Sequence, residues 1–150
     1  MTDERTAVLT GGCQCGAVRF AFYAAPIRVG ICHCRMCQRA TASPFAGLAD
    51  VPMADFAWTR GAPKAFASSS IAERHFCADC GTSLSYHQLG GANMEILLGA
   101  FDDPDAVPPT YAVGIESKVA WFDTLHELPG KTFAEYAGAD AEAKVESNQS

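Results

Sequence analysis

Seven cysteines fall into three tight groups, and this clustering constrains the chain more than any other feature. The groups are Cys13-x-Cys15, Cys32-x-Cys34-x-x-Cys37 and Cys77-x-x-Cys80. Cysteines two positions apart make poor disulfide partners, because so small a ring strains the torsion that a disulfide prefers. An odd number of cysteines also leaves one thiol without a partner. The spacing therefore predicts metal ligands rather than disulfides.

The composition bounds the class of protein. A chain of 150 residues that is 49% hydrophobic and 19% charged is typical of one globular domain. The sequence has no apolar run long enough to cross a membrane, and its first residues carry no secretory signal, so we expect a cytoplasmic location, where disulfides are rare. A net charge of −6 argues against binding nucleic acid through a general basic surface, but it leaves room for a local basic pocket.

Short segments of alternating or apolar character predict a mainly β protein with little helix. The predicted strands are 18–23, 27–31, 45–48, 65–66, 73–76, 82–87, 94–98 and 111–115. Short helical turns are predicted over 35–40 and 131–137, the second with Thr132 and Glu135 spaced as a capping box. After Gly138 the chain becomes polar and poor in aromatic residues. We therefore predict one domain over 1–137 and a flexible tail over 138–150.

Four of the cysteines have the spacing of a closed zinc site. Each pair is followed by a glycine, Gly16 or Gly81, which can adopt the positive φ that a tight turn needs. The pairs are Cys13 with Cys15 and Cys77 with Cys80. We place the first pair on an extended segment, where alternate residues point the same way. Four thiolate ligands leave no open position, so this zinc is predicted to be structural and to contribute to the folding free energy.

Cys32, Cys34 and Cys37 form a group of three, which can hold a metal and leave one position open, the pattern of catalytic zinc. Zinc held by three thiolates has a formal charge of −1, so it is poorly suited to making hydroxide and better suited to holding an incoming thiolate. Two alternatives stay open. All seven cysteines could serve one structural cluster, or a histidine could complete the trio. The candidates are His33, His75 and His87, of which His33 lies on the opposite strand face.

The clusters and their flanks resemble the glutathione-dependent formaldehyde-activating enzyme family, also called the centromere-protein-V-type family. The resemblance covers about residues 10–129. The matching segments are 11–19, 32–39, 44–45, 76–82, 116–121 and 128–129. It implies a β-tent fold, in which small antiparallel sheets are tied together by a structural four-cysteine zinc. It also implies the same division of the cysteines between two ions.

The resemblance further implies an activity, the condensation of glutathione with formaldehyde to S-hydroxymethylglutathione, formally that of a carbon–sulfur lyase. We therefore expect an enzyme whose partners are a small thiol and an aldehyde. The thiol would replace water at the three-cysteine zinc, lose its proton to water or to His33, and attack the carbonyl carbon. The alternative is a non-catalytic zinc module that binds a protein partner.

Three further residues are candidates for the site. Arg35 and Arg39 lie within and just after the central cluster, where they could hold a carboxylate of a glutathione-like ligand. The alternative for both is a solvated helix face or an ion pair with an acidic neighbour. His33 is a candidate proton shuttle beside the metal, and the alternative is a packed structural histidine.

Overall fold

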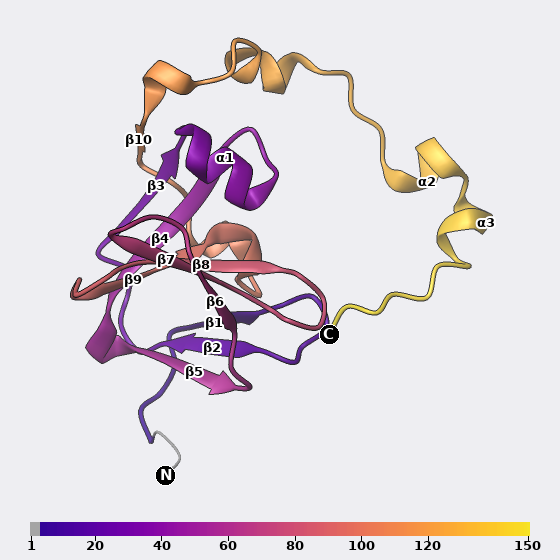
Figure 1. Ribbon diagram of the computed structural model, residues 1–150. Helices are drawn as coiled ribbons and strands as arrows, with labels where there is room; N and C mark the ends of the chain where they lie inside the picture. The colour runs from indigo at the N-terminus through magenta and orange to yellow at the C-terminus, as the bar shows by residue number, and fades with distance from the viewer. Residues whose placement is uncertain (1–3) are drawn as a thin grey trace.

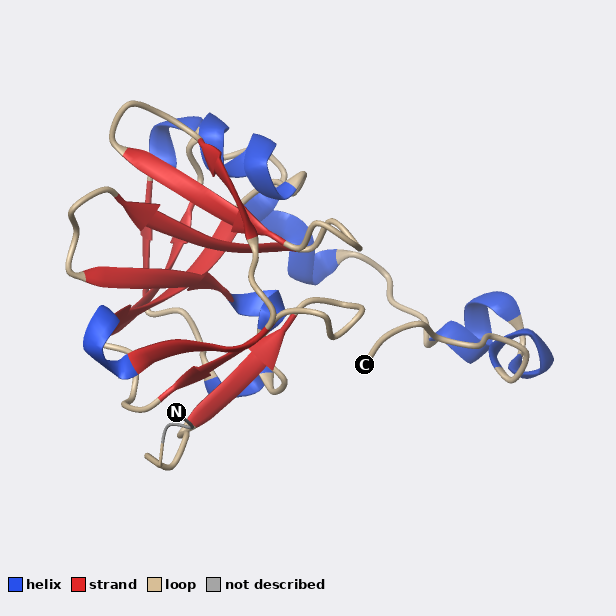
Figure 2. Cartoon of the chain, turned by 60° about the horizontal axis from the view of Figure 1, so that its bottom comes forward, coloured by secondary structure: helices blue, strands red, loops and turns tan. Residues whose placement is uncertain are grey.

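Two β-sheets form the body of the protein in the computed structural model, which describes residues 4–150 (Figure 1 and Figure 2). The smaller, antiparallel sheet has the order β1-β2-β5, with β1 (Leu9–Gly12), β2 (Arg19–Phe22) and β5 (Phe56–Arg60). The larger sheet contains, in order, β10 (Tyr111–Val113), β3 (Arg28–Cys32), β4 (Ala46–Pro52), β9 (Asn93–Leu97), β8 (Ser83–Gln88), β7 (Ala72–Phe76) and β6 (Lys64–Ala67). The predicted mainly β class with little helix is confirmed. Residues 1–3 of the predicted domain lie outside the described residues.

The strands predicted from hydrophobic pattern are present, but the sheets differ from the expectation in two respects. One sheet has seven strands rather than a few, and its edge strand β10 pairs with β3 in parallel. Two further strands, β1 and β5, were not predicted from the sequence. The cause at β1 is Gly11, where an added Cβ would lie 2.2 Å from the Ala100 carbonyl oxygen. This strand carries a glycine because another backbone passes directly over it.

Helices are short. The α-helices are α1 (Arg35–Thr41), α2 (Phe133–Ala137) and α3 (Ala139–Glu142), and 3₁₀ turns occupy Met53–Asp55, Leu98–Ala100, Pro104–Ala106, Ile115–Ser117 and Phe122–Glu127. The capping box between Thr132 and Glu135 is present at the start of α2. No helix among residues 4–150 has the length and apolar character of a membrane-spanning segment.

Aromatic side chains fill the space between the two sheets. Phe20 and Phe22 alternate along β2 and are fully buried. Phe20 contacts the rings of Phe56, Trp58 and Phe101 at centroid distances of 5.2–6.3 Å. The inner face of the larger sheet contributes Val29, Ala49, Val51, Met94 and Ile96. Because side chains alternate along a strand, the residues between these point to the opposite face of that sheet.

An ion pair fastens the smaller sheet to the chain that follows β9. The guanidinium of Arg19 donates to Asp102 Oδ1 at 2.8 Å, and the Thr10 hydroxyl donates to Asp102 Oδ2 at 2.6 Å. Hydrogen bonds from Arg19 hold the pKa of Asp102 below its usual range. The Asp102 side chain is 48% exposed, so the pair contributes modestly to stability.

Beyond β10 the chain arcs over α1, where Phe122 packs against His33 and Phe45, and then leaves the body of the protein and passes through α2 and α3 (Figure 1). It then returns to the end of the β1–β2 hairpin, where the Ser150 amide donates to the Gln14 carbonyl oxygen at 2.9 Å. The segment after Gly138 contains the single turn α3. The boundary between domain and tail at residue 137 stays a prediction.

Candidate metal centres

Four cysteine sulfurs meet where the two sheets come together. Cys13, Cys15, Cys77 and Cys80 each offer a sulfur, and all four sulfurs lie within 4.8 Å of one another. The Sγ–Sγ distance is 3.6 Å between Cys13 and Cys15 and 3.8 Å between Cys15 and Cys77. A tetrahedral ion with Zn–S bonds of about 2.3 Å requires sulfurs about 3.8 Å apart. All seven cysteines of the chain are free thiols, so this group has the geometry of a closed metal site.

Two similar turns build this group. Gly16 and Gly81 both have φ of +78°, and their amides donate to the carbonyl oxygens of Cys13 and Cys77 at 3.1 and 2.9 Å. The expectation that Cys13 and Cys15 lie on an extended segment is wrong, because β1 ends at Gly12 and the chain then turns. The turn nevertheless brings the two sulfurs together, and the amide of Val18 donates to Cys13 Sγ at 3.2 Å.

The group links elements that are distant in the sequence. Cys13 and Cys15 lie in the loop of the β1–β2 hairpin, and Cys77 and Cys80 lie in the turn between β7 and β8. The first hairpin belongs to the smaller sheet and the second to the larger. Cys13 and Cys77 are buried within the hydrophobic core cluster. An ion at this position would therefore hold the two sheets together.

The other three cysteines form a separate group at the start of α1. Cys32 ends β3, Cys34 is the N-cap of α1, and Cys37 lies in the first turn of the helix. Their sulfurs also lie within 4.8 Å of one another. The Cys37 amide donates to Cys34 Sγ at 3.4 Å, which is how the helix begins. In the described chain neither group includes a histidine, and the seven sulfurs do not form a single cluster.

The pKa values of the thiols differ widely within each group of cysteines. Burial, and then the neighbouring thiols, raise the pKa of Cys32 to about 12. Despite a backbone hydrogen bond from Ala17, the Cys80 thiol raises the pKa of Cys15 to about 12. Hydrogen bonds from Thr82 lower the pKa of Cys80 to about 5. The sulfurs alone therefore do not all ionise at neutral pH, and a divalent cation is what would stabilise each set as thiolates.

The three-cysteine group opens onto a small cavity of about 200 Å³, which all three cysteines line together with Arg74, Tyr86, Glu95 and Tyr111. The Arg74 guanidinium donates to Cys37 Sγ at 3.4 Å and lies 4.9 Å above the centre of the Tyr86 ring. The four-cysteine group, in contrast, contributes no residue to this cavity. The four-cysteine group thus has the arrangement of a closed site, and the three-cysteine group has that of an open one.

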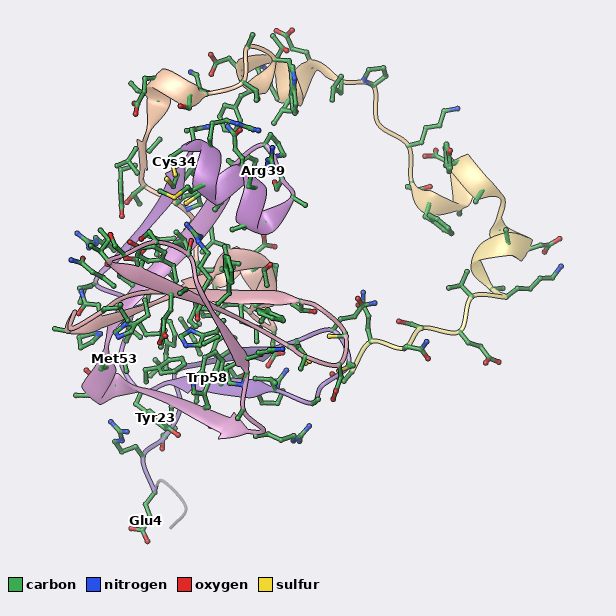
Figure 3. All side chains as sticks on the ribbon, in the orientation of Figure 1. Glu4, Tyr23, Cys34, Arg39, Met53 and Trp58 are labelled. Atoms are coloured by element: carbon green, nitrogen blue, oxygen red, sulfur yellow. The ribbon has the colours of Figure 1, made fainter. Side chains whose placement is uncertain are left out.

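A larger cavity of about 920 Å³ adjoins the small one, and Met36 and Arg74 line both. Its cationic residues are Arg35, Arg39, Lys64 and Arg74, and no carboxylate of the described chain lines it. Figure 3 shows Cys34 and Arg39 on the same side of the molecule, beside α1. The chain thus combines an overall charge of −6 with a local basic cavity.

His33 lies away from the sulfurs. Its side chain is 1% exposed, and its ring packs against those of Phe122 and Phe45 at centroid distances of 4.6 and 6.3 Å. Nδ1 of His33 is buried without a hydrogen-bond partner in the described structure. His33 follows the last residue of β3 and does not line the cysteine cavity. This position matches the packed structural role, and a proton-shuttle role for His33 has no geometric support.

The sequence analysis missed the polar residues that line the cysteine cavity. Arg74, Tyr86 and Glu95 lie on three neighbouring strands, β7, β8 and β9. The one local signal is at β9, where Glu95 stands between the buried residues Met94 and Ile96. A charged residue on a strand so placed belongs to the outer face of the sheet. Its proximity to the cysteines depends on strand order, which the pattern does not reveal.

The fold and the two cysteine groups define a class: a two-sheet β protein with one closed and one open group of cysteines, each of which could hold a metal ion. Residues 8–117 match the family model described as "Glutathione-dependent formaldehyde-activating enzyme". The chain therefore belongs to the glutathione-dependent formaldehyde-activating enzyme family, as its motifs predicted.

Two comparisons place the chain further. It is similar to an uncharacterised lyase of Schizosaccharomyces pombe, with 32% identity over 83 residues, which are 55% of this chain and 60% of that protein. The chain thus spans only part of the length of this relative. The crystal structure of a Rhodobacter sphaeroides protein has the same fold, with a TM-score of 0.56 at 20% identity over 69% of this chain and 99% of that one.

Proposed function

We propose that the protein is a zinc-dependent carbon–sulfur lyase that joins a small anionic thiol, such as glutathione, to a small aldehyde, such as formaldehyde. The observation that carries this proposal is the position of Cys32, Cys34 and Cys37 on the wall of a small cavity that adjoins a larger, cation-lined one. Family membership and a relative named as a lyase support the reaction class.

Zinc at the three cysteines would supply a soft cationic site that holds a thiol as its thiolate. Three thiolates and Zn²⁺ sum to a formal charge of −1, which suits thiol chemistry better than the formation of hydroxide. A second, structural zinc belongs to the four-cysteine group. That group has no place for a substrate, because its four sulfurs complete a tetrahedron.

The residues of the larger cavity bind the rest of the thiol substrate. Glutathione carries two carboxylates at neutral pH, and Arg35, Arg39 and Lys64 offer cationic donors in the lining of this cavity. Arg35 also donates to the amide oxygen of Gln38. Its guanidinium is thereby oriented at the first turn of α1. A volume of about 920 Å³ is within the usual range for small-molecule sites.

The smaller cavity is where the new bond forms. The thiolate sulfur attacks the carbonyl carbon, a C–S bond forms, the C=O π bond breaks, and the oxygen takes up a proton to become a hydroxyl. A volume of about 200 Å³ favours an aldehyde of very few atoms. Arg74, which contacts Cys37, provides positive charge beside the sulfurs while the reaction proceeds. His33 packs against Phe122 and Phe45 and takes no part in this step.

The metal content and its response to thiol test the proposal. We expect two zinc ions per chain, and a cobalt-substituted protein whose absorption changes when glutathione is added. One inert metal per chain would overturn the proposal and favour the alternative, a zinc module that binds a protein partner.

A charge variant tests the role of the larger cavity. Arg39→Ala should weaken glutathione binding about tenfold, the loss of one charge-assisted hydrogen bond, whereas Lys131→Ala, which removes a cation outside the cavity, should not. With 2-mercaptoethanol, a thiol without carboxylates, the two variants should behave alike. An equal effect of Arg39→Ala on both thiols would contradict carboxylate recognition.

A further inference from the structure

One row of charged and aromatic residues crosses the outer face of the larger sheet. Its members are direct neighbours on adjacent strands, in the order Arg74, Tyr86, Glu95, Asp50 and Arg28. At one end Arg74 contacts Cys37, and at the other Arg28 Nε donates to Asp50 Oδ2 at 2.5 Å. The middle of the row, Glu95, lines the same cavity as the three cysteines. The row thus leads from the sulfurs to a pair of carboxyl groups.

The two carboxyl groups of this row have different surroundings. Asp50 is 2% exposed and is paired with the Arg28 guanidinium, so its charge is compensated. Glu95 is partly buried, and its neighbour Asp50 is negative. Burial, and then the charge of Asp50, raise the pKa of Glu95 to about 7, against the opposing effects of Arg28 and Arg74. Of the two carboxyl groups, Glu95 is therefore the one suited to exchanging a proton.

We propose that Glu95 is a catalytic residue that carries the proton of the incoming thiol to the oxygen of the aldehyde. This inference rests on the proposed function. The Glu95 carboxylate accepts the proton that the thiol loses on binding. When the C–S bond forms and the C=O π bond breaks, the same carboxyl group gives that proton to the oxygen. The thiol and the aldehyde become one adduct, Glu95 returns to its carboxylate, and no other reactant is consumed.

Other groups of the cavity suit this role less well. Burial raises the pKa of Tyr86 and of Tyr111 above the ordinary range, so both keep their protons at neutral pH and do not accept one from a thiol. The Arg74 guanidinium offers donors and no acceptor. His33 packs against Phe45 and Phe122 and does not line the cavity. A carboxyl group that titrates near neutrality is what a proton transfer in both directions needs.

Counting protons on thiol binding tests this assignment without an activity assay. Calorimetric titration of the zinc-loaded protein with glutathione at pH 7, in buffers of different ionisation enthalpy, gives the number of protons released. We expect the unaltered protein to release fewer protons than Glu95→Gln, because Glu95 takes up part of what the thiol loses, and Glu95→Gln to release about one. Glu127→Gln, at an exposed site that lines neither cavity, is the control and should match the unaltered protein.

The rate of adduct formation provides a second readout. Glu95→Gln should slow exchange between formaldehyde and its glutathione adduct, followed by NMR, at least 100-fold, with little change in glutathione affinity. It should also remove the inflection near pH 7 from the rate profile. The groups that face Glu95 and shape this profile are Arg28, Asp50, Arg74, Tyr86, Tyr111 and the three cysteines.

The outcomes separate the two proposals. If the unaltered protein binds no glutathione, the proposed function fails and this inference fails with it. If it binds and reacts, but Glu95→Gln releases the same number of protons or keeps the inflection, only the role of Glu95 is overturned. Should Glu95→Gln not fold, ¹³C NMR of the carboxyl group in the unaltered protein decides. We expect Glu95 to gain its proton when glutathione binds at pH 7, and a carboxyl that stays ionised would overturn the inference.

Discussion

Replacing one cysteine in each group should have unequal consequences. Cys77 is 1% exposed and lies in the core, at the junction of the two sheets. In Cys77→Ser the closed site loses a thiolate that no neighbour replaces. Metal bound at a structural site contributes on the order of 10 kcal/mol to folding, whereas the whole stability of a domain is about 5–15 kcal/mol. We therefore expect Cys77→Ser to be unfolded or aggregated.

Cys34→Ser is the matched change in the open group. Cys34 is the N-cap of α1, and its sulfur accepts a hydrogen bond from the Cys37 amide. Serine is among the preferred N-cap residues, so its hydroxyl can take over this bond and the helix should still begin at Arg35. This variant should remain folded, with its melting temperature within a few degrees of the unaltered protein, and carry about one zinc per chain instead of two.

Three measurements check this pair of variants: soluble yield, zinc per chain after gel filtration, and thermal unfolding followed by circular dichroism. Chelator added to the unaltered protein should reproduce the behaviour of Cys77→Ser. A folded Cys77→Ser protein that keeps a zinc would refute the reasoning, as would equal unfolding of both variants, because either result denies that one group holds the fold and the other does not.

Three further changes test packing and charge. Phe20→Ala should lower the unfolding free energy by about 3–5 kcal/mol, because Phe20 is fully buried. Tyr136→Ala changes an 80% exposed site, and in the same chemical denaturation series its unfolding free energy should stay within about 0.5 kcal/mol of the unaltered protein's. Gly11→Ala places a Cβ 2.2 Å from a carbonyl oxygen and should lower the unfolding free energy by about 1–3 kcal/mol or more. In the control, Gly130→Ala, the added Cβ meets nothing within 4 Å, and the melting temperature should not fall. Asp102→Asn should cost about 1 kcal/mol or less at pH 7. The pKa of Asp102 is lowered in the folded state. The stabilisation is therefore present above pH about 4 and is lost as the pH falls through the lowered pKa. Unfolding curves of the two proteins that still differ at the lowest pH would contradict the pairing.

Local features were the most predictable part of this protein. The capping box at Thr132 and the positive φ of Gly16 and Gly81 depend only on a few consecutive residues. The strands could be located because alternation of side chains is a property of each strand alone. Two strands were missed where the alternation of side chains is weak. At Gly11 the reason is that a backbone segment distant in the sequence passes too close to leave room for a side chain.

The sequence by itself determined that the cysteines act in groups and that the protein is mainly β, because ligand spacing and side-chain alternation are local. Only the tertiary structure decided which polar residues meet the sulfurs. Arg74, Tyr86 and Glu95 come from separate strands and share one cavity because β7, β8 and β9 are neighbours in the sheet. The tertiary structure also placed His33 among aromatic rings, away from the cysteines that flank it in the sequence. Strand order and burial depend on the packing of the whole chain, and no short segment encodes them.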